Sequence, residues 1–174
     1  EGRLNLRITE DLMDDVITEA LHHINRKSEE HHISVESKEE FLLAKMDAKL
    51  IVQVIINIVD NAIKYTPQGG KVTLSASVEG KMAMIHVCDT GIGIPKAEIK
   101  SIFKTFFRAS NAINSQEMGS GLGLMLTRKL VEKLGGKLSF VSEEGKGTTF
   151  CVKMPLGNVT DSSVRLVGEK KNVV

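Results

Sequence analysis

One polar stripe runs along an otherwise apolar segment between Asp47 and Tyr65. Its polar members are Gln53, Asn57, Asn61 and Lys64, whose spacings of four, four and three place them on one face of a helix. Almost every other position is apolar, which is typical of a buried helix. Buried amides need hydrogen-bond partners, so the stripe either bonds loop backbone or lines a polar pocket.

The pocket alternative has a definite chemistry. Amide oxygens such as those of Asn57 and Asn61 suit Mg²⁺, a hard cation that keeps several waters and is often completed by substrate phosphates. The ammonium group of Lys64 would complement phosphate charge beside such an ion.

A carboxylate extends an apolar strand face further along the chain. Asp89 alternates with Ala83, Ile85 and Val87, so it shares their side of the predicted strand. Asp-Thr-Gly is good turn chemistry, and an Asx turn is one explanation. The glycines that follow, Gly91 and Gly93, instead favour the close approach of a ligand or of backbone, and Asp89 would then accept from a ligand amine.

The segment GSGLGL, residues 119–124, precedes a predicted helix. Glycines 119 and 121 before a helix N-terminus expose backbone N–H groups to an anion. The spacing is not a dinucleotide fingerprint because Leu124 stands where the third glycine would be. The chain also has no GxxxxGK[ST] motif, which excludes P-loop chemistry. The Asp-Thr-Gly tripeptide occurs once, whereas an aspartic protease needs paired carboxylates.

The elements that would position these residues follow from periodicity and turn signals. We expect a helix after Thr9 as N-cap, two short strands near residues 33–35 and 41–44, and a long helix from the Asp47 N-cap to Tyr65. Strands are predicted at 71–79, 81–89, 137–142 and 148–155, with a short helix at 96–102 and another at 122–134. Residues 108–120 are expected to form a mobile loop, and 157–174 a tail without an assigned structure. This order predicts an α+β two-layer sandwich.

Composition excludes several function classes. The 174 residues carry 23 Lys+Arg and 22 Asp+Glu, with 4% aromatics and no Trp, which argues against a nucleic-acid platform. The two cysteines, Cys88 and Cys151, are too few for a disulfide framework and suit a reducing compartment. No apolar run approaches the ~20 residues that a membrane span needs, so we expect a soluble domain.

Taken in order, IINIVDNAIKYTP, DTGIGIP, IFKTFFR and GSGLGL resemble the four sequence boxes of the ATP-binding catalytic domain of sensor histidine kinases. The resemblance covers about residues 4–156 and is specific because four boxes occur in the right order and spacing. It implies a Bergerat-type fold, with a mixed, mainly antiparallel sheet of about five strands under three helices. It also implies a domain at residues 1–156, followed by the tail 157–174.

The resemblance further implies roles for individual residues. Asn61 would coordinate Mg²⁺ between the phosphates of ATP, and Asp89 would accept from the adenine 6-amino group. Asn57, Asn61, Lys64 and Arg108 are the implied catalytic residues, and Phe103 and Phe106 would anchor the loop before Arg108. The implied nucleotide-binding residues are Asn57, Asn61, Lys64, Tyr65, Asp89, Gly91, Gly93, Ile94, Gly119, Gly121, Leu122, Gly123 and Thr148, with Thr149 an equal alternative to Thr148.

One position separates the implied reaction types. ATP hydrolases of the wider superfamily carry a general-base glutamate four residues before the Mg²⁺ asparagine, where this chain has Asn57. An amide cannot take a proton, so the resemblance implies phosphoryl transfer to a protein histidine. Two alternatives remain, a nucleotide-sensing module without catalysis and an ATPase or anti-sigma-type serine kinase.

The implied phosphate acceptor is not in this chain. In the family it is a histidine of a separate dimerisation domain, followed by an acidic residue and then proline, and none of the five histidines here has that context. The resemblance therefore implies a catalytic domain excised from a longer, membrane-bound sensor. It would lie in the cytoplasm, be monomeric, act on the dimerisation domain and signal to a response regulator.

Overall fold

The protein is described by a computed structural model that covers residues 5–24, 31–37, 42–105, 107–113, 123–155 and 165–166. Five strands form its main sheet, in the order β2-β4-β5-β7-β6. β2 runs parallel to β4, and the other neighbouring pairs are antiparallel. The predicted mixed, mainly antiparallel sheet is therefore confirmed. Its strands are β2 (His32–Ser37), β4 (Lys71–Glu79), β5 (Met82–Asp89), β6 (Lys137–Glu143) and β7 (Gly147–Pro155).

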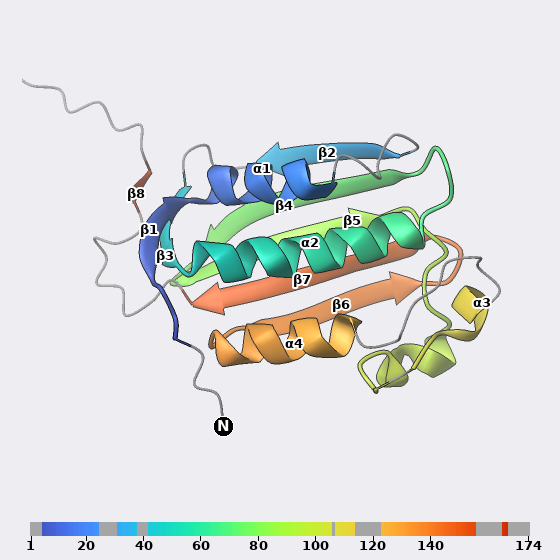
Figure 1. The fold of residues 1–174 in the computed structure, drawn as a ribbon. Coiled ribbons are helices and arrows are strands. Elements are labelled where there is room, and N and C mark those ends of the chain that lie inside the picture. Colours follow the sequence, from blue (N-terminus) through green and yellow to red (C-terminus); the bar gives the residue numbers. More distant parts are fainter. Residues whose placement is uncertain are drawn as a thin grey trace, which may run out of the picture.

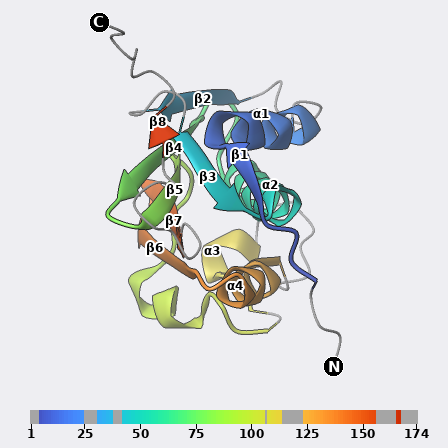
Figure 2. The ribbon, with the colours of Figure 1, turned by 90° about the vertical axis from the view of Figure 1, so that its left-hand side faces the viewer.

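Three helices cover one face of this sheet (Figure 1). They are α1 (Met13–Ile24), α2 (Ala48–Lys64) and α4 (Gly123–Lys133). Seen from the end in Figure 2, the helices form one layer and the five strands form the other. The two-layer α+β architecture predicted from the sequence is confirmed.

The central helix α2 forms the middle of the core. Val54, Ile55, Ile58 and Val59 are fully buried between the sheet and the neighbouring helices. Asp47 caps the helix as predicted, because its Oδ1 accepts from the N–H of Leu50 at 3.3 Å. The cap fixes where the helix begins and therefore which residues reach its far end.

Strand alternation places Asp89 where the sequence pattern predicted. Ala83, Ile85 and Val87 of β5 are buried toward the helices. Asp89 ends the strand on the same side and lies opposite Thr148 in the antiparallel pairing of β5 with β7. The carboxylate thus lies at the sheet end that faces the C-terminus of α2.

The expected helix cap at Thr9 is wrong. Residues Thr9–Leu12 form strand β1, which pairs with β3 (Leu42–Met46), and α1 begins only at Met13. Thr9 lies opposite Met46, so cross-strand hydrogen bonds satisfy backbone groups that the helix would otherwise have used.

The strand β8 (Arg165–Leu166) pairs with the other edge of β3 and completes a small second sheet. The rest of the 157–174 tail lies outside the described residues.

The segment after β5 is more regular than expected. The short helix predicted at 96–102 is the 3₁₀ helix η1 (Lys96–Ser101), and α3 (Ser110–Ile113) occupies part of the predicted loop 108–120. Ala109 and Ala112 are buried against Ile94, which explains why this part of the loop is helical. The N–H of Ser110 also donates to Oε2 of Glu98 at 2.9 Å. Residues 114–120 lie outside the described part of the chain.

Candidate nucleotide site

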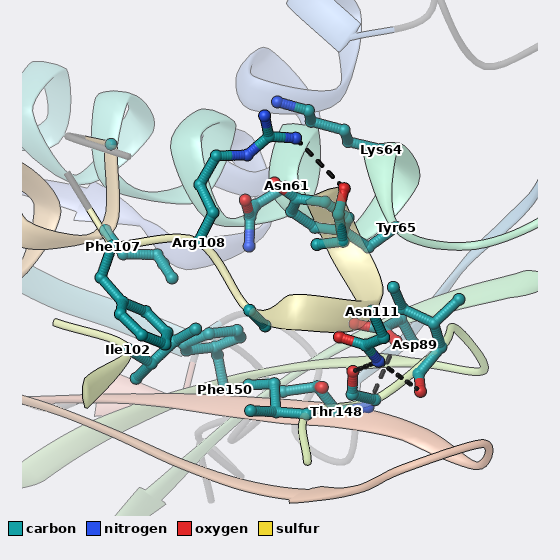
Figure 3. Close-up of a pocket in the computed structure, with 17 residues that line it drawn as sticks. Asn61, Lys64, Tyr65, Asp89, Ile102, Phe107, Arg108, Asn111, Thr148 and Phe150 are labelled. Atoms are coloured by element: carbon teal, nitrogen blue, oxygen red, sulfur yellow. Dashed lines mark hydrogen bonds between the residues drawn. The ribbon is translucent and has the colours of Figure 1, made fainter. Parts of the chain in front are cut away.

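A cavity of about 360 Å³ opens where the end of α2, the end of β5 and the start of β7 meet α3 and α4 (Figure 3). Its walls come from segments that are distant in the sequence. They comprise Asn61, Lys64, Tyr65, Asp89, Ile92, Gly93, Ile94, Ile102, Phe107, Arg108, Ala109, Asn111, Ala112, Gly123, Leu124, Thr148 and Phe150.

Asp89 is held at one end of the cavity by two backbone donors. The N–H of Gly91 donates to its Oδ1 at 2.9 Å, and the N–H of Thr148 donates to the same oxygen at 3.2 Å. Both of these donors use Oδ1, and neither uses Oδ2. The carboxylate is therefore fixed by one oxygen and presents the other as an acceptor to a ligand.

Burial raises the pKa of Asp89 above the ordinary aspartate value, because the charged form is desolvated. The N–H groups of Gly91 and Thr148 act in the opposite direction, since hydrogen bonds to the carboxylate favour ionisation. A buried acceptor of this kind in a cleft is typical of a binding site.

The opposite end of the cavity carries positive charge and an amide. In Figure 3 the side chains of Lys64 and Arg108 lie with Asn61 on the side away from Asp89 and Thr148. Lys64 Nζ lies 5.4 Å from the ring centre of Tyr65, and Arg108 Nη2 donates to the Ala112 carbonyl at 3.2 Å. This end suits a phosphate group, and the Asp89 end suits an amine.

Apolar side chains form the wall between the two ends. Ile102, Phe107 and Phe150 line the cavity with flat or branched surfaces, a composition that suits a planar ring. Phe103 lies behind this wall, with its ring centre 5.5 Å from that of Phe140 and the Arg128 guanidinium carbon 5.1 Å from its centre. Phe103 thus anchors the segment, while Phe106 lies outside the described residues.

The two glycines after Asp89 are required by close backbone contacts. A Cβ on Gly91 would lie 2.4 Å from the Tyr65 carbonyl oxygen. Gly93 has φ +64°, and a Cβ there would lie 2.0 Å from the Glu143 carbonyl oxygen. Both glycines permit a close approach of backbone beside Asp89. Gly93 also lines the cavity, so the approach of a ligand to it stays a prediction.

The structure brings most of the sequence-predicted residues together. Nine of them line the cavity: Asn61, Lys64, Tyr65, Asp89, Gly93, Ile94, Arg108, Gly123 and Thr148. Gly119, Gly121 and Leu122 lie outside the described residues. Of the two threonine alternatives, Thr148 lines the cavity, whereas Thr149 donates its hydroxyl to Cys88 Sγ at 3.2 Å and is not a lining residue.

Asn57 does not line the cavity. Its Oδ1 accepts from Gln53 Nε2 at 2.8 Å, and its Nδ2 donates to Thr127 Oγ1 at 3.2 Å. Thr127 in turn donates to the carbonyl of Gly123, the first residue of α4 and a lining residue. Asn57 thus joins α2 to the start of α4, and its catalytic role stays a prediction.

Phe107 and Asn111 are two of the lining residues that were not predicted as site residues from the sequence. Phe107 follows two other phenylalanines in IFKTFFR, and nothing in that run shows which ring faces the cavity. Asn111 lies in the short helix α3, and its Nδ2 donates to the Gly93 carbonyl at 2.9 Å. Its position depends on how α3 packs against the loop after β5, which has no signature in local sequence.

Metal ligands in the described part of the chain are sparse. Those residues contain no group of three or more His, Cys, Asp or Glu that could hold a metal ion. A Mg²⁺ ion here would rest on the Asn61 amide oxygen and on the phosphates of a bound ligand, an arrangement that this cation accepts.

Comparison with known proteins assigns the chain to a protein family. Residues 46–158 match the family described as histidine kinase-, DNA gyrase B- and HSP90-like ATPase, and the chain belongs to this family. Within it, the similar proteins are sensor histidine kinases, so the resemblance to their catalytic ATP-binding domain is confirmed.

Three sensor kinases show the extent of the similarity. The chain is 32% identical to the sensor protein KdpD of Clostridium acetobutylicum over 155 residues, which is 89% of this chain and 17% of that protein. It is 41% identical to the sensor histidine kinase WalK of Bacillus subtilis over 116 residues, 66% of this chain and 19% of that protein. The solved catalytic domain of the histidine kinase ThkA is 28% identical, with a TM-score of 0.75 over 87% of this chain and 97% of that domain.

The chain thus spans less than a fifth of the length of these two curated relatives. Among the described residues, no helix is long and apolar enough to cross a membrane.

Proposed function

We propose that this chain binds ATP with Mg²⁺ and transfers the γ-phosphoryl group to a histidine of a dimerisation domain in its parent protein. The observation that carries the proposal is the polarity of the cavity. Asp89 presents an acceptor at one end, and Asn61, Lys64 and Arg108 line the other, with an apolar wall between them. ATP has groups in the matching order. The adenine amine is a donor, the adenine ring is planar, and the phosphates beyond the ribose carry negative charge.

The adenine end selects the base. The ionised Asp89 Oδ2 accepts from the adenine 6-amino group, whereas guanine has a carbonyl at the corresponding position and would face the carboxylate with an acceptor. Thr148 supports the carboxylate through its N–H. This arrangement favours ATP over GTP because an unpaired buried acceptor is costly.

The phosphate end supplies positioning and charge rather than a base. Mg²⁺ held by Asn61 and the phosphates would neutralise developing charge, and Lys64 and Arg108 would act in the same direction. The histidine nitrogen attacks the γ-phosphorus, the bond from γ-phosphorus to the β,γ-bridging oxygen breaks, and ADP leaves with that electron pair. In the described structure the amide of Asn57 joins helices, so it provides no group that activates water.

The similarity to sensor histidine kinases also indicates which partners the parent protein would have. The solved structure of the histidine kinase ThkA in complex with the response regulator protein TrrA is 26% identical to this chain, with a TM-score of 0.71. We propose that the parent of this chain likewise acts on a response regulator, from a cytoplasmic position, after phosphorylating its own dimerisation domain.

Phosphoryl transfer to a separately purified dimerisation domain of the parent tests the proposal. With ATP labelled in the γ-position, we expect acid-labile, base-stable phosphate on the acceptor histidine. The label should disappear with Asn61→Ala and with EDTA, while Lys49→Ala, at an exposed position of the same helix outside the cavity, should retain it. ATP binding without transfer would show a nucleotide-sensing module, and steady ATP hydrolysis by the chain alone would show an ATPase.

A further inference from the structure

Asn111 links the short helix α3 to the loop that follows β5. Its Nδ2 donates to the carbonyl of Gly93 at 2.9 Å and lies 3.5 Å from the carbonyl of Ile92. Because both contacts use the NH₂ group, the orientation of the amide is fixed, and its oxygen must point away from that loop backbone.

The oxygen of this amide is buried and lacks a donor. Among the described residues nothing donates to Asn111 Oδ1, although the atom is shielded from solvent. Buried acceptors are paired in the great majority of native structures, and an unpaired one costs free energy. Asn111 also lines the cavity, near Asp89 and Thr148 in Figure 3. A ligand in the cavity would supply the missing donor once a small rotation of the Asn111 side chain uncovers this oxygen.

The same loop positions Asp89 and Asn111. The N–H of Gly91 holds Asp89, and the carbonyl of Gly93 holds Asn111. Both residues thus belong to the amine end of the cavity, away from the phosphate end with Lys64 and Arg108. Phosphates at physiological pH offer no donor, whereas a primary aromatic amine offers two hydrogens in the plane of its ring.

We propose that Asn111 is a second base-reading residue, whose Oδ1 accepts one hydrogen of the adenine 6-amino group while Asp89 accepts the other. The proposal rests on the ATP site proposed above and deepens it. Two acceptors require an unsubstituted amine, so the site would reject both a carbonyl at this position and an amine that carries an alkyl group.

Calorimetric affinities for ATP and N⁶-methyl-ATP test the proposal, since the methyl group removes one of the two donors. We expect the wild-type chain to bind N⁶-methyl-ATP about tenfold or more weakly than ATP. In Asn111→Ala, ATP should bind about tenfold more weakly than in the wild type, and the ratio between the two nucleotides should fall several-fold.

A matched control separates base recognition from support of the helix. Glu98→Ala removes the acceptor for the Ser110 N–H and so weakens the attachment of the same helix, but it leaves the Asn111 amide in place. This variant should keep the wild-type ratio between the two nucleotides. Asn111→Ser, which retains a small polar group near Gly93 but is too short to reach the base, should behave like Asn111→Ala.

The outcomes are distinct. An unchanged ratio in both Asn111 variants, with ATP still bound by the wild type, would overturn the role of Asn111 and leave the ATP site intact. An equal fall in the ratio for Glu98→Ala would reduce Asn111 to a support of α3. Failure of the wild type to bind ATP would overturn this inference together with the proposed function.

Discussion

The backbone N–H of Thr148 donates to Oδ1 of Asp89 at 3.2 Å, although the two residues lie 59 positions apart in the chain. The pairing of β5 with β7 sets them opposite each other. A third residue, Ser142 of β6, accepts from the Ile94 N–H at 2.9 Å and lies 2.8 Å from the Thr148 hydroxyl. Three strands and the loop after β5 therefore hold the carboxylate in place before any ligand arrives, which reduces the ordering that binding must impose.

The hydroxyl of Ser142 also determines the role of Thr148. It donates to the Gly147 carbonyl at 3.1 Å and has one hydrogen, so the Thr148 hydroxyl must be the donor in the contact between the two side chains. The Thr148 hydroxyl oxygen then keeps its lone pairs, and Thr148 lines the cavity. This arrangement adds an acceptor beside Asp89.

Replacing Asp89 by asparagine should separate binding from folding. Gly91 and Thr148 can still donate to the amide oxygen, so the fold should persist. The affinity for ATP should fall by about 10- to 100-fold, because the ionised acceptor for the adenine amine is lost. Calorimetry measures the affinity, and thermal unfolding without nucleotide is the control. ATP binding equal to that of the wild type would contradict the placement of the adenine.

The affinity for ATP should depend on pH through Asp89. Burial raises the pKa of this carboxyl, and only its ionised form is a full acceptor, so affinity should fall as the pH drops through the raised pKa. The folding stability contributed by Asp89 should change in the opposite direction and decrease as the pH rises. The folded chain holds the proton more tightly than the unfolded chain, so ionisation costs folding free energy as the pH rises from the ordinary aspartate value through the raised one.

Comparison with Asp89→Asn removes the titration of ATP itself. The ratio of wild-type to variant affinity, measured from near the ordinary aspartate pKa up to neutral pH, should decrease toward the acidic end. A ratio that does not change with pH would mean that Asp89 does not titrate at the binding site.

Gly147→Ala should destabilise the fold strongly. Gly147 has φ +123°, and a Cβ there would lie 2.0 Å from the carbonyl oxygen of Asp89. We expect a loss of about 2–4 kcal/mol in the free energy of unfolding, measured with urea. Gly145→Ala is the matched control, because φ there is +80° but no atom lies within 4 Å, and it should cost only about 1 kcal/mol. Equal losses would show that the contact with Asp89 does not limit this turn.

The cap of α2 should contribute measurable stability. Asp47 is 7% exposed and accepts from the Leu50 N–H and, at 2.8 Å, from the Arg7 N–H. Asp47→Ala should lower the free energy of unfolding by about 1–3 kcal/mol because two backbone donors lose their acceptor. Asp47→Asn, which keeps an acceptor oxygen, should lose less, and an equal loss in both variants would contradict the capping role.

Local chemistry explains which parts of the fold could be predicted. The Asp47 cap and the alternation that ends at Asp89 are determined by neighbouring residues, and both were predicted. The helix cap predicted at Thr9 was wrong because residues 9–12 pair with the strand at residues 42–46. A local sequence pattern does not reveal this pairing. The α3 helix was missed for a similar reason, since Ala109 and Ala112 are buried in a cluster with Ile94, which lies elsewhere in the sequence.

Some residues of the site are likewise indicated by the local sequence, and others are placed only by tertiary packing. Asn61 and Asp89 could be predicted as site residues because a carboxylate or an amide in an apolar pattern requires an explanation. Asn57 shows the same pattern, yet its amide bonds Gln53 and Thr127 and does not line the cavity. Asn111 and Phe107 reach the cavity through tertiary packing alone, so only the structure identifies them.

Recognition of adenine by Asp89 is tested by the binding of ATP and GTP to the wild-type chain, measured side by side by calorimetry in the presence of Mg²⁺. We expect saturable binding of ATP at one site, and no binding of GTP at the same concentrations, because the guanine carbonyl would face the Asp89 carboxylate. Equal affinities for the two nucleotides, or no binding of ATP, would contradict it.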